Sequence, residues 1–261
     1  MLVELNAALL EDAIIYAVNK HRGQKRKGNG LPYIVHPLAV MKRVFDNKES
    51  KNMFLLAIAA INHDIIEDCY KTMEEKKAGL HEIATIFGFQ VASLVEELTL
   101  DKSQYGSLGK KEFLAIKMNG MSSYALAIKL CDRLENVCDM KAMNEKFKKR
   151  YVVETWYILN NLNRKLSPSH KKMIQDIKDI LNQYPEYNEA EETVNYFAAN
   201  IQEGHSCGTI AQQLEMIGAT IDEIDSKNNV IYGSIEGTFD IIFDSNINGL
   251  TSIKKVEKQL A

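Results

Sequence analysis

The densest group of reactive side chains lies directly after the apolar run Met53–Ile61, where His63, Asp64, Glu67 and Asp68 follow one another closely. On a helix, His63 and Glu67 would share one face, and Asp64 and Asp68 would share another. Burying such charges without partners costs several kcal/mol, so they need a cation or polar neighbours. A divalent metal would satisfy His63 and Asp64 at once. The alternative is a solvated helix end that carries an acidic cluster.

Two further residues of metal-binding type occur elsewhere in the chain. His36 stands directly before Pro37, where we expect a new helix to begin, and Asp132 lies in the apolar stretch Ala125–Leu134. A lone histidine of this kind is usually a packed core residue, and Asp132 could instead pair with Arg133 or with a basic loop residue. Two histidines and two carboxylates together suit a first-row divalent ion with open positions for water, such as Mn²⁺, Fe²⁺ or Zn²⁺.

A basic loop precedes His36 and contains Arg22, Lys25, Arg26 and Lys27. Arginine and lysine pair with phosphate oxygens, and a planar guanidinium group stacks on a base. Runs of charge are more often solvated surface. This run lies only a few residues before His36, which makes it a candidate phosphate-binding segment.

The spacing of apolar residues predicts a series of helices that would position these side chains. Ser167 and Pro168 have the residue types of an N-cap and a first helical position. The predicted helices are Asn6–His21, Pro37–Phe45, Asn52–Asp68, Leu80–Leu98 (one helix or two), Lys111–Asn119, Ser122–Met143, Glu145–Leu166 and a last one from Pro168 to about Gln183.

The pattern changes after Pro185. Residues 189–202 and 206–217 are predicted to be helical, and residues 249–260 are expected to add a final helix. Between them, three segments alternate apolar and polar residues and are separated by turn residues, which predicts an antiparallel meander. The segments are Ala219–Ile224, Val230–Ile235 and Thr238–Phe243. We therefore expect a mainly α fold, with a helical domain at 1–185 and a small α+β tail at 186–261.

The composition narrows the class of protein. The chain has 261 residues, and its 32 Lys and Arg against 35 Asp and Glu give a net charge of −3, which argues against bulk affinity for nucleic acid. The first residues lack the features of a secretion signal, and no run reaches the roughly 18 apolar residues of a membrane span. Its four cysteines form no Cys-x-x-Cys pair, which indicates reduced thiols. We expect a cytoplasmic protein with no membrane partner.

Taken in order, these motifs resemble the hydrolase domain of RelA/SpoT proteins, which belongs to the HD phosphohydrolase superfamily. The resemblance spans roughly residues 5–182 and is closest to the small stand-alone hydrolases of the metazoan SpoT homologue type. The matching residues are Arg26-Lys27, Pro32-Tyr33-Ile34 with His36-Pro37, His63-Asp64 with Glu67-Asp68, Phe87-Gly88, Thr99 with Asp101-Lys102, and Lys129-Leu130 with Asp132-Arg133-Leu134 and Asn136.

The resemblance implies an HD-type helical bundle that hydrolyses guanosine tetra- or pentaphosphate at its 3′-pyrophosphate, yielding GDP or GTP and pyrophosphate. It implies a metal, usually Mn²⁺, and a water-activating acidic pair. The residues that match its metal ligands are His36, His63, Asp64 and Asp132, and the pair is Glu67 and Asp68. The positions that match substrate contacts are Arg26, Lys27 and Asn136, with Arg22 and Lys102 as further candidates.

The sequence departs from the family pattern at three places. Cys131 stands for the usual alanine and is a small apolar replacement, Glu135 stands for the usual histidine, and the unusual Gly28-Asn29-Gly30 in the basic loop could reshape the base pocket. Glu135 adds negative charge near a polyphosphate site. The same scaffold could therefore act on another phosphorylated nucleotide, such as the 2′-phosphate of NADPH or an adenosine alarmone. A non-catalytic nucleotide sensor is the alternative from a different class, although an intact acidic pair argues against it.

The tail is too short for the synthetase domain that bifunctional relatives carry, and it has no glycine-rich phosphate loop. We expect it to be an oligomerisation or regulatory module, so that the protein would form a homo-oligomer. The alternative is a cap that covers apolar surface of the helical body.

Overall fold

The computed structural model describes residues 4–100, 105, 109–184, 187, 211–212, 215, 219–225, 230–235, 239–245 and 251–256. The chain divides into two compact units, Met1–Gln183 and Tyr184–Ala261.

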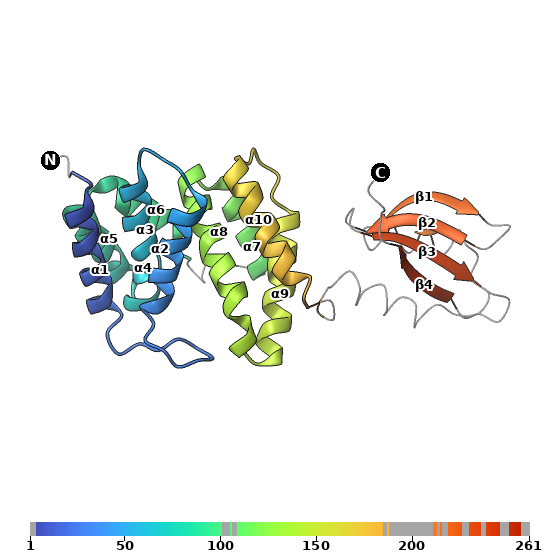
Figure 1. Cartoon of the computed structure of the whole chain (residues 1–261), viewed down its shortest axis with the longest axis horizontal. Helices are drawn as coiled ribbons and strands as arrows, with labels where there is room; N and C mark the ends of the chain where they lie inside the picture. The colour runs from blue at the N-terminus through green and yellow to red at the C-terminus, as the bar shows by residue number, and fades with distance from the viewer. Residues whose placement is uncertain are drawn as a thin grey trace. The chain divides into compact units, whose positions relative to one another are not determined.

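The first unit is built from helices joined by loops (Figure 1). Within the described residues, none of its helices combines the length and the apolar character that a bilayer crossing requires. The helices are α1 (Ala7–Lys20), α2 (Val35–Asn47), α3 (Met53–Ile61), α4 (Ile65–Cys69), α5 (Met73–Phe87), α6 (Phe89–Leu98), α7 (Lys110–Gly120), α8 (Ser123–Cys138), the 3₁₀ turn η2 (Asp139–Ala142), α9 (Glu145–Asn160) and α10 (Pro168–Leu181).

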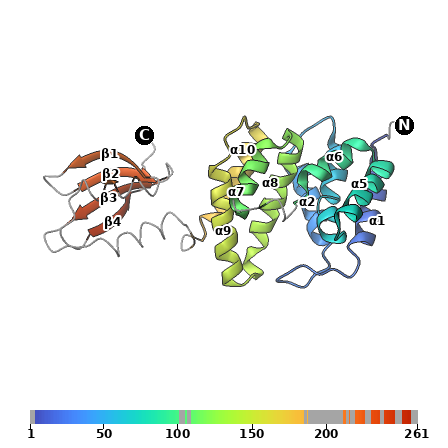
Figure 2. The same cartoon turned by 180° about the vertical axis from the view of Figure 1, so that it is seen from behind.

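Two helices form the centre of this unit. α3 is apolar on every side, as expected for a helix that is surrounded by others, and it packs against α1, α2, α6 and α8. α8 in turn contacts α2, α6, α9 and α10, and Figure 2 shows α5 and α6 on the reverse side of the same body. The end of α3 and the middle of α8 therefore meet inside the core. The predicted mainly α fold is confirmed.

One predicted helix is broken at the point where the chemistry lies. The segment Asn52–Asp68 was expected to be a single helix, but α3 ends at Ile61 and α4 begins at Ile65. The break is stabilised by side chains that take over backbone acceptors: Asn62 Nδ2 donates to Ile58 O at 2.8 Å and His63 Nδ1 donates to Ala60 O at 2.8 Å. Such local side-chain bonds compete with helix propagation.

Several helix limits also differ from the predictions. α2 begins at Val35, so His36 lies inside its first turn and Pro37 is its third residue; proline is tolerated there because first-turn N–H groups lack helical partners. α5 begins earlier than predicted, at Met73, behind a capping box formed by Thr72 and Glu75. The predicted helix Ser122–Met143 divides into α8 and η2, and α9 ends at Asn160 instead of Leu166.

The second unit contains an antiparallel sheet with strand order β1-β2-β3-β4. Its strands are Ala219–Asp225, Val230–Ile235, Phe239–Ser245 and Thr251–Val256, so the predicted meander is present. The helix expected at 249–260 is wrong: β4 pairs with β3 from Asp240–Val256 to Ser245–Thr251, and its β-branched residues favour a strand. The helix expected at 189–202 lies outside the described residues. Of the segment 206–217, only residues 211, 212 and 215 are described, and they are helical.

A buried histidine makes the stability of the first unit depend on pH. His170 Nε2 donates to Ser123 O at 3.0 Å, and its Nδ1 accepts the Ser167 N–H at 3.3 Å, which caps α10. Burial lowers the pKa of His170 below its ordinary value of 6.5. The unfolded chain therefore binds a proton more readily than the folded one, so this contribution is present above about pH 6.5 and is lost at lower pH.

We expect His170 to contribute up to about 1.4 kcal/mol per pH unit less to the free energy of unfolding as the pH falls from 7.5 to 5.5, seen as a difference between the wild type and a variant without this group. His170→Gln should be less stable than the wild type at pH 7.5, and the difference between the two should shrink toward pH 5.5. Urea denaturation at a series of pH values measures both quantities. His81→Gln, which changes an exposed histidine on α5, is the matched control and should keep the wild-type slope. An unchanged slope in His170→Gln would contradict the assignment.

Candidate metal and nucleotide site

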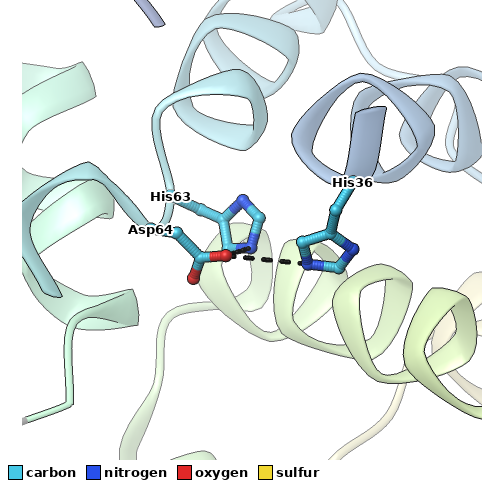
Figure 3. Close-up of side chains that lie close together, drawn as sticks. All are labelled: His36, His63 and Asp64. Carbon is cyan, nitrogen blue, oxygen red and sulfur yellow. Dashed lines mark ion pairs between the residues drawn. The ribbon is translucent and has the colours of Figure 1, made fainter. Parts of the chain in front are cut away.

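The four residues that the sequence marked as metal ligands lie together in the first unit. Asp64 Oδ2 is 3.0 Å from His63 Nε2 and 3.6 Å from His36 Nε2, and both rings point toward this carboxylate in Figure 3. Asp132 Oδ1, from the middle of α8, is 3.1 Å from His36 Nε2 and 3.7 Å from His63 Nε2. Ligand atoms of His36, His63 and Asp64 all lie within 4.8 Å of one another.

The tautomer of His63 leaves a nitrogen lone pair facing the cluster, as a metal ligand requires. Because His63 Nδ1 donates to the Ala60 carbonyl, a neutral His63 presents a bare lone pair at Nε2. That Nε2 is buried and has no hydrogen bond of normal geometry within the described residues. Two imidazole nitrogens and two carboxylate oxygens thus face one small volume, and this mixed donor set suits a divalent metal ion.

Neighbouring groups hold the two carboxylates in place. Tyr33 donates its hydroxyl to Asp64 Oδ2 at 2.7 Å. Asn136 Nδ2 donates to Asp132 Oδ1 at 2.7 Å, and Lys129 Nζ lies 2.8 Å from Asp132 Oδ2. Such outer partners fix ligand orientation in metal sites. The alternative considered for Asp132 was an ion pair with Arg133 or a basic loop residue; its ion-pair partner is instead Lys129, one helical turn earlier on α8.

The charges of this cluster shift proton affinities strongly. Burial alone would lower the pKa of His63, but Asp64 and Asp132 raise it to about 10. Burial likewise opposes the charge of Lys129, yet Asp132 and Asp64 raise its pKa. The cations in turn hold the pKa values of both aspartates below the ordinary range, although burial acts the other way. Without a metal, a proton on His63 balances the carboxylates. A bound divalent ion would take the place of that proton.

The acidic pair predicted to act on water lies on α4, beside the metal cluster. Burial raises the pKa of Glu67; Asp64 and Asp68 add to this effect and Lys129 opposes it. Partial burial and the charge of Asp64 raise the pKa of Asp68, which is exposed at the edge of the site. A carboxyl group with a raised pKa is better suited to accept a proton near neutral pH.

Two adjoining cavities contain these groups. The smaller one, called the metal cavity, has a volume of about 170 Å³. It is lined by three of the four metal-ligand candidates (His36, Asp64 and Asp132), by Glu67 and by further charged side chains. A wider cleft of about 470 Å³ is lined by Gln24, Lys25, Arg26, Lys27, Tyr33, Asp68, Asn136, Met143 and Phe147. Tyr33, Asp68 and Asn136 line both. A ligand in the cleft can therefore reach the metal cavity without crossing the core.

The predicted nucleotide contacts divide into two groups. Arg26, Lys27 and Asn136 line the cleft, and Arg26 is fixed there by Asp139 Oδ2 at 2.6 Å from Nε and by Asn136 Oδ1 at 3.0 Å from Nη2. Arg22 lines neither cavity and donates instead to Asn19 on α1. Lys102 lies outside the described residues.

The departures from the family pattern are accommodated by packing. Glu135 lines neither cavity, and Arg43 neutralises it with Nε at 2.5 Å from Oε2. Cys131 is buried and its Sγ lies 3.4 Å from Met173 Sδ on α10. Gly28 has a φ of +94°, and a Cβ there would lie 2.9 Å from Met143 Sδ. The glycine therefore lets the basic loop approach a residue that lines the cleft.

Some site residues were missed by the sequence predictions. Lys129 and Tyr33 were noticed only as family positions, although a lysine three residues before Asp132 in an apolar helix is itself a pairing signal. Lys110, Tyr151 and Glu154 line the metal cavity. They come from α7 and α9, and no sequence pattern joins these helices to His36 or His63.

The sequence of the helical unit is similar to that of known proteins. Residues 13–167 match the family model described as HD domain. The human guanosine-3′,5′-bis(diphosphate) 3′-pyrophosphohydrolase MESH1 is 31% identical over 179 residues, which cover 68% of this chain and 95% of the human protein. The mouse protein of the same name is 37% identical over 135 residues, covering 51% and 70%.

A bacterial protein and a solved structure are also similar to this chain. A guanosine-3′,5′-bis(diphosphate) 3′-pyrophosphohydrolase of Aquifex aeolicus is 30% identical over 207 residues, covering 76% of this chain and 27% of that protein. A solved structure of a metazoan SpoT orthologue, described as hydrolysing ppGpp, superposes with a TM-score of 0.57 at 24% identity, over 70% of this chain and 99% of the other. That likeness shows the fold. The chain belongs to the HD-domain family, and its resemblance to the small stand-alone members of the RelA/SpoT type is confirmed.

Proposed function

We propose that this protein is a metal-dependent 3′-pyrophosphohydrolase of guanosine tetra- and pentaphosphate. The observation that carries the proposal is the junction of the two cavities: a cleft lined by Lys25, Arg26 and Lys27 opens onto a cluster of metal donors and acidic groups. Relatives that carry this activity in their names match most of the helical unit. A polyphosphorylated nucleotide has the charge and size that the cleft suits.

The metal would be held by His36, His63, Asp64 and Asp132, and we propose Mn²⁺, with Fe²⁺ or Zn²⁺ as the alternatives. A bound divalent ion lowers the pKa of a coordinated water and neutralises charge on a phosphoryl group. His63 Nε2 is buried and makes no hydrogen bond of normal geometry within the described part of the chain, which supports this set of ligands. Asn136 and Lys129 donate hydrogen bonds to the Asp132 carboxylate and so fix its orientation.

Glu67 and Asp68 are proposed to act on the attacking water. One of them accepts the water proton while the oxygen forms a bond to the phosphorus next to the ribose. The bond from that phosphorus to the ribose 3′-oxygen breaks, and the 3′-oxygen takes up a proton. The products are GDP or GTP and pyrophosphate. Glu67 is the better base of the two, because it is more deeply placed and its Oε2 is steadied by the Leu100 N–H at 3.4 Å.

The nucleotide would lie in the cleft. Arg26 lines the cleft and uses Nε and Nη2 for Asp139 and Asn136, so its Nη1 is proposed to meet the ligand. Lys25 and Lys27 are exposed and offer mobile ammonium groups for the 5′-phosphates. Phe147 adds an aromatic surface for a base.

The proposed metal set predicts the behaviour of two variants. His63→Gln and Asp64→Asn should each abolish high-affinity Mn²⁺ binding, as measured by metal content after dialysis. Wild-type protein at a hundredfold excess of Mn²⁺ over its dissociation constant should gain about 2.7 kcal/mol in the free energy of unfolding. The two variants should gain almost none. His81→Gln is the control and should keep the full metal content. Full metal content in His63→Gln or in Asp64→Asn would contradict the ligand assignment.

The role of Glu67 is tested by turnover. Glu67→Gln removes the proton acceptor but keeps the size of the side chain, so we expect turnover of ppGpp to fall by about a hundredfold or more. Metal content should be unchanged. Glu74→Gln, which alters an exposed glutamate in the first turn of α5, should retain activity. Full activity in Glu67→Gln would remove it from the mechanism.

A substrate panel tests the activity itself. Purified protein with Mn²⁺ should release GDP and pyrophosphate from ppGpp, and chelation should abolish the release. Phosphate release from NADPH without turnover of ppGpp would keep the site and overturn the proposed substrate. Binding of ppGpp without turnover of any member of the panel, ppApp included, would indicate a sensor.

We also propose that residues 1–185 carry the hydrolase and that residues 186–261 form an oligomerisation or regulatory module. The proposal is supported by the division of the chain into two compact units at Gln183–Tyr184. Deletion of residues 187–261 should change the oligomeric state or the regulation of turnover, measured by light scattering and by assays over a range of nucleotide concentrations. If mass, turnover and regulation all stay the same, the tail has no such role.

A further inference from the structure

The metal cavity contains a second group of charges that the proposed hydrolysis does not use. Lys110 from α7, Arg133 from α8, and Tyr151 and Glu154 from α9 line the same cavity as the metal-ligand candidates. None of the four belongs to the cluster of His36, His63 and Asp64 that could hold a metal. Three helices thus contribute two cations, a phenol and a carboxylate to one small space.

Arg133 is held rigidly but is incompletely paired. It is 3% exposed, and it donates from Nη1 to Thr155 Oγ1 at 2.8 Å and from Nη2 to Glu154 Oε1 at 3.3 Å. Its Nε, however, has no hydrogen-bond partner within the described residues. The guanidinium group also lies over the ring of Tyr151, 5.1 Å from the ring centre. A buried donor without an acceptor is costly, so the described residues do not fully satisfy this guanidinium group.

Glu154 is shared between the two cations. Its carboxylate lies 2.8 Å from Lys110 Nζ and 3.3 Å from Arg133 Nη2. Burial would raise the pKa of Glu154, but Arg133 and Lys110 lower it, so the carboxylate stays charged. It neutralises one of the two cations, and the group keeps a net charge of about +1. Lys110 is partly exposed, with 45% of its side chain accessible, so it can turn toward a second anion without unfolding α7.

The size of the cavity also exceeds what a single phosphoryl group needs. At roughly 30 Å³ per water molecule, 170 Å³ corresponds to about six waters. Tyr151 adds a hydroxyl that stays protonated, because burial and nearby carboxylates raise its pKa to about 12 although Arg133 acts in the opposite direction. A phenol of this kind can donate a hydrogen bond to a phosphate oxygen.

We propose that Lys110, Arg133 and Tyr151 form a subsite for the distal phosphate of a pyrophosphoryl group, with Glu154 holding the two cations in place until that phosphate arrives. The inference rests on the proposed function, because it assumes that the proximal phosphate lies at the metal donors. The subsite selects the class of substrate: a diphosphate ester fills it, whereas a monophosphate ester such as the 2′-phosphate of NADPH leaves it empty. The same groups bind the released pyrophosphate.

Lys110→Gln is the primary test, since Lys110 is the accessible member of the group. We expect the variant to lose about tenfold in affinity for pyrophosphate, the effect of one charge-assisted contact, and less than about twofold for orthophosphate. Titration calorimetry with the full-length, metal-loaded protein measures both, each anion being supplied with the same free magnesium. Lys111→Gln is the matched control: Lys111 is the next residue on α7 and lies over the ring of Tyr157. Equal losses for the two anions, or no loss, would overturn the subsite.

Glu154→Gln is expected to change the affinity for pyrophosphate in the opposite direction. Removing the carboxylate frees both cations, so pyrophosphate should bind more tightly than to the wild type, whereas a merely structural role predicts weaker binding. Breaking a buried ion pair is destabilising, and thermal unfolding will show whether this variant folds. If it does not, the result with Lys110→Gln decides the question alone.

Kinetics separate this inference from the proposed function. Lys110→Gln should reduce kcat/KM for ppGpp by about tenfold and leave that for guanosine 5′-diphosphate 3′-monophosphate within about twofold of wild type. If neither nucleotide is hydrolysed by the wild type but the anion titrations behave as expected, the proposed function fails and the subsite stands. If ppGpp is hydrolysed and Lys110→Gln changes neither binding nor kcat/KM, the subsite fails and the function stands.

Discussion

Two imidazole rings and two carboxylates lie within one helical core, and their mutual repulsion and lost hydration require a positive charge among them. In the absence of a metal, a proton on His63 and the ammonium group of Lys129 supply it. The helices of this unit place the charged side chains that compensate one another. α3 is apolar on all sides up to Ile61, so it fixes the position at which the charged residues begin.

The interruption between α3 and α4 is what makes the cluster possible. In a continuous helix, His63 and Asp64 would project about 100° apart, because neighbouring residues are separated by one step of a 3.6-residue turn. The break at Asn62 and His63, held by bonds to carbonyl groups of α3, brings Nε2 of His63 to 3.0 Å from Asp64 Oδ2. α4 then resumes with Glu67 and Asp68 facing the same site. One local irregularity thus brings Asp64 and the acidic pair to the same cavity.

The sequence predicted the residues of the site better than their arrangement. His36, His63, Asp64 and Asp132 were identified by type and by family resemblance, and the structure brings all four together. The broken helix was not predicted, because its cause is a tertiary environment in which Asn62 is fully buried and bonds to its own helix. The strand Thr251–Val256 was mistaken for a helix, since six residues carry little periodic signal and the pairing with β3 decides the outcome. Arg22 was assigned to phosphate by proximity in sequence, but its side chain faces Asn19.

The chain of contacts from the cleft to the metal donors explains how nucleotide binding and chemistry can be linked. Asp139 fixes Arg26, Arg26 contacts Asn136, and Asn136 donates to Asp132 at 2.7 Å. From the other side, Tyr33 lines the cleft and donates to Asp64. Each contact thus connects a residue that lines the cleft with a carboxylate of the candidate metal site. Both links are hydrogen bonds of normal length in a part-buried setting, where such bonds are stronger than in water. Two short hydrogen-bonded paths therefore connect the cleft with the two carboxylates of the metal cavity.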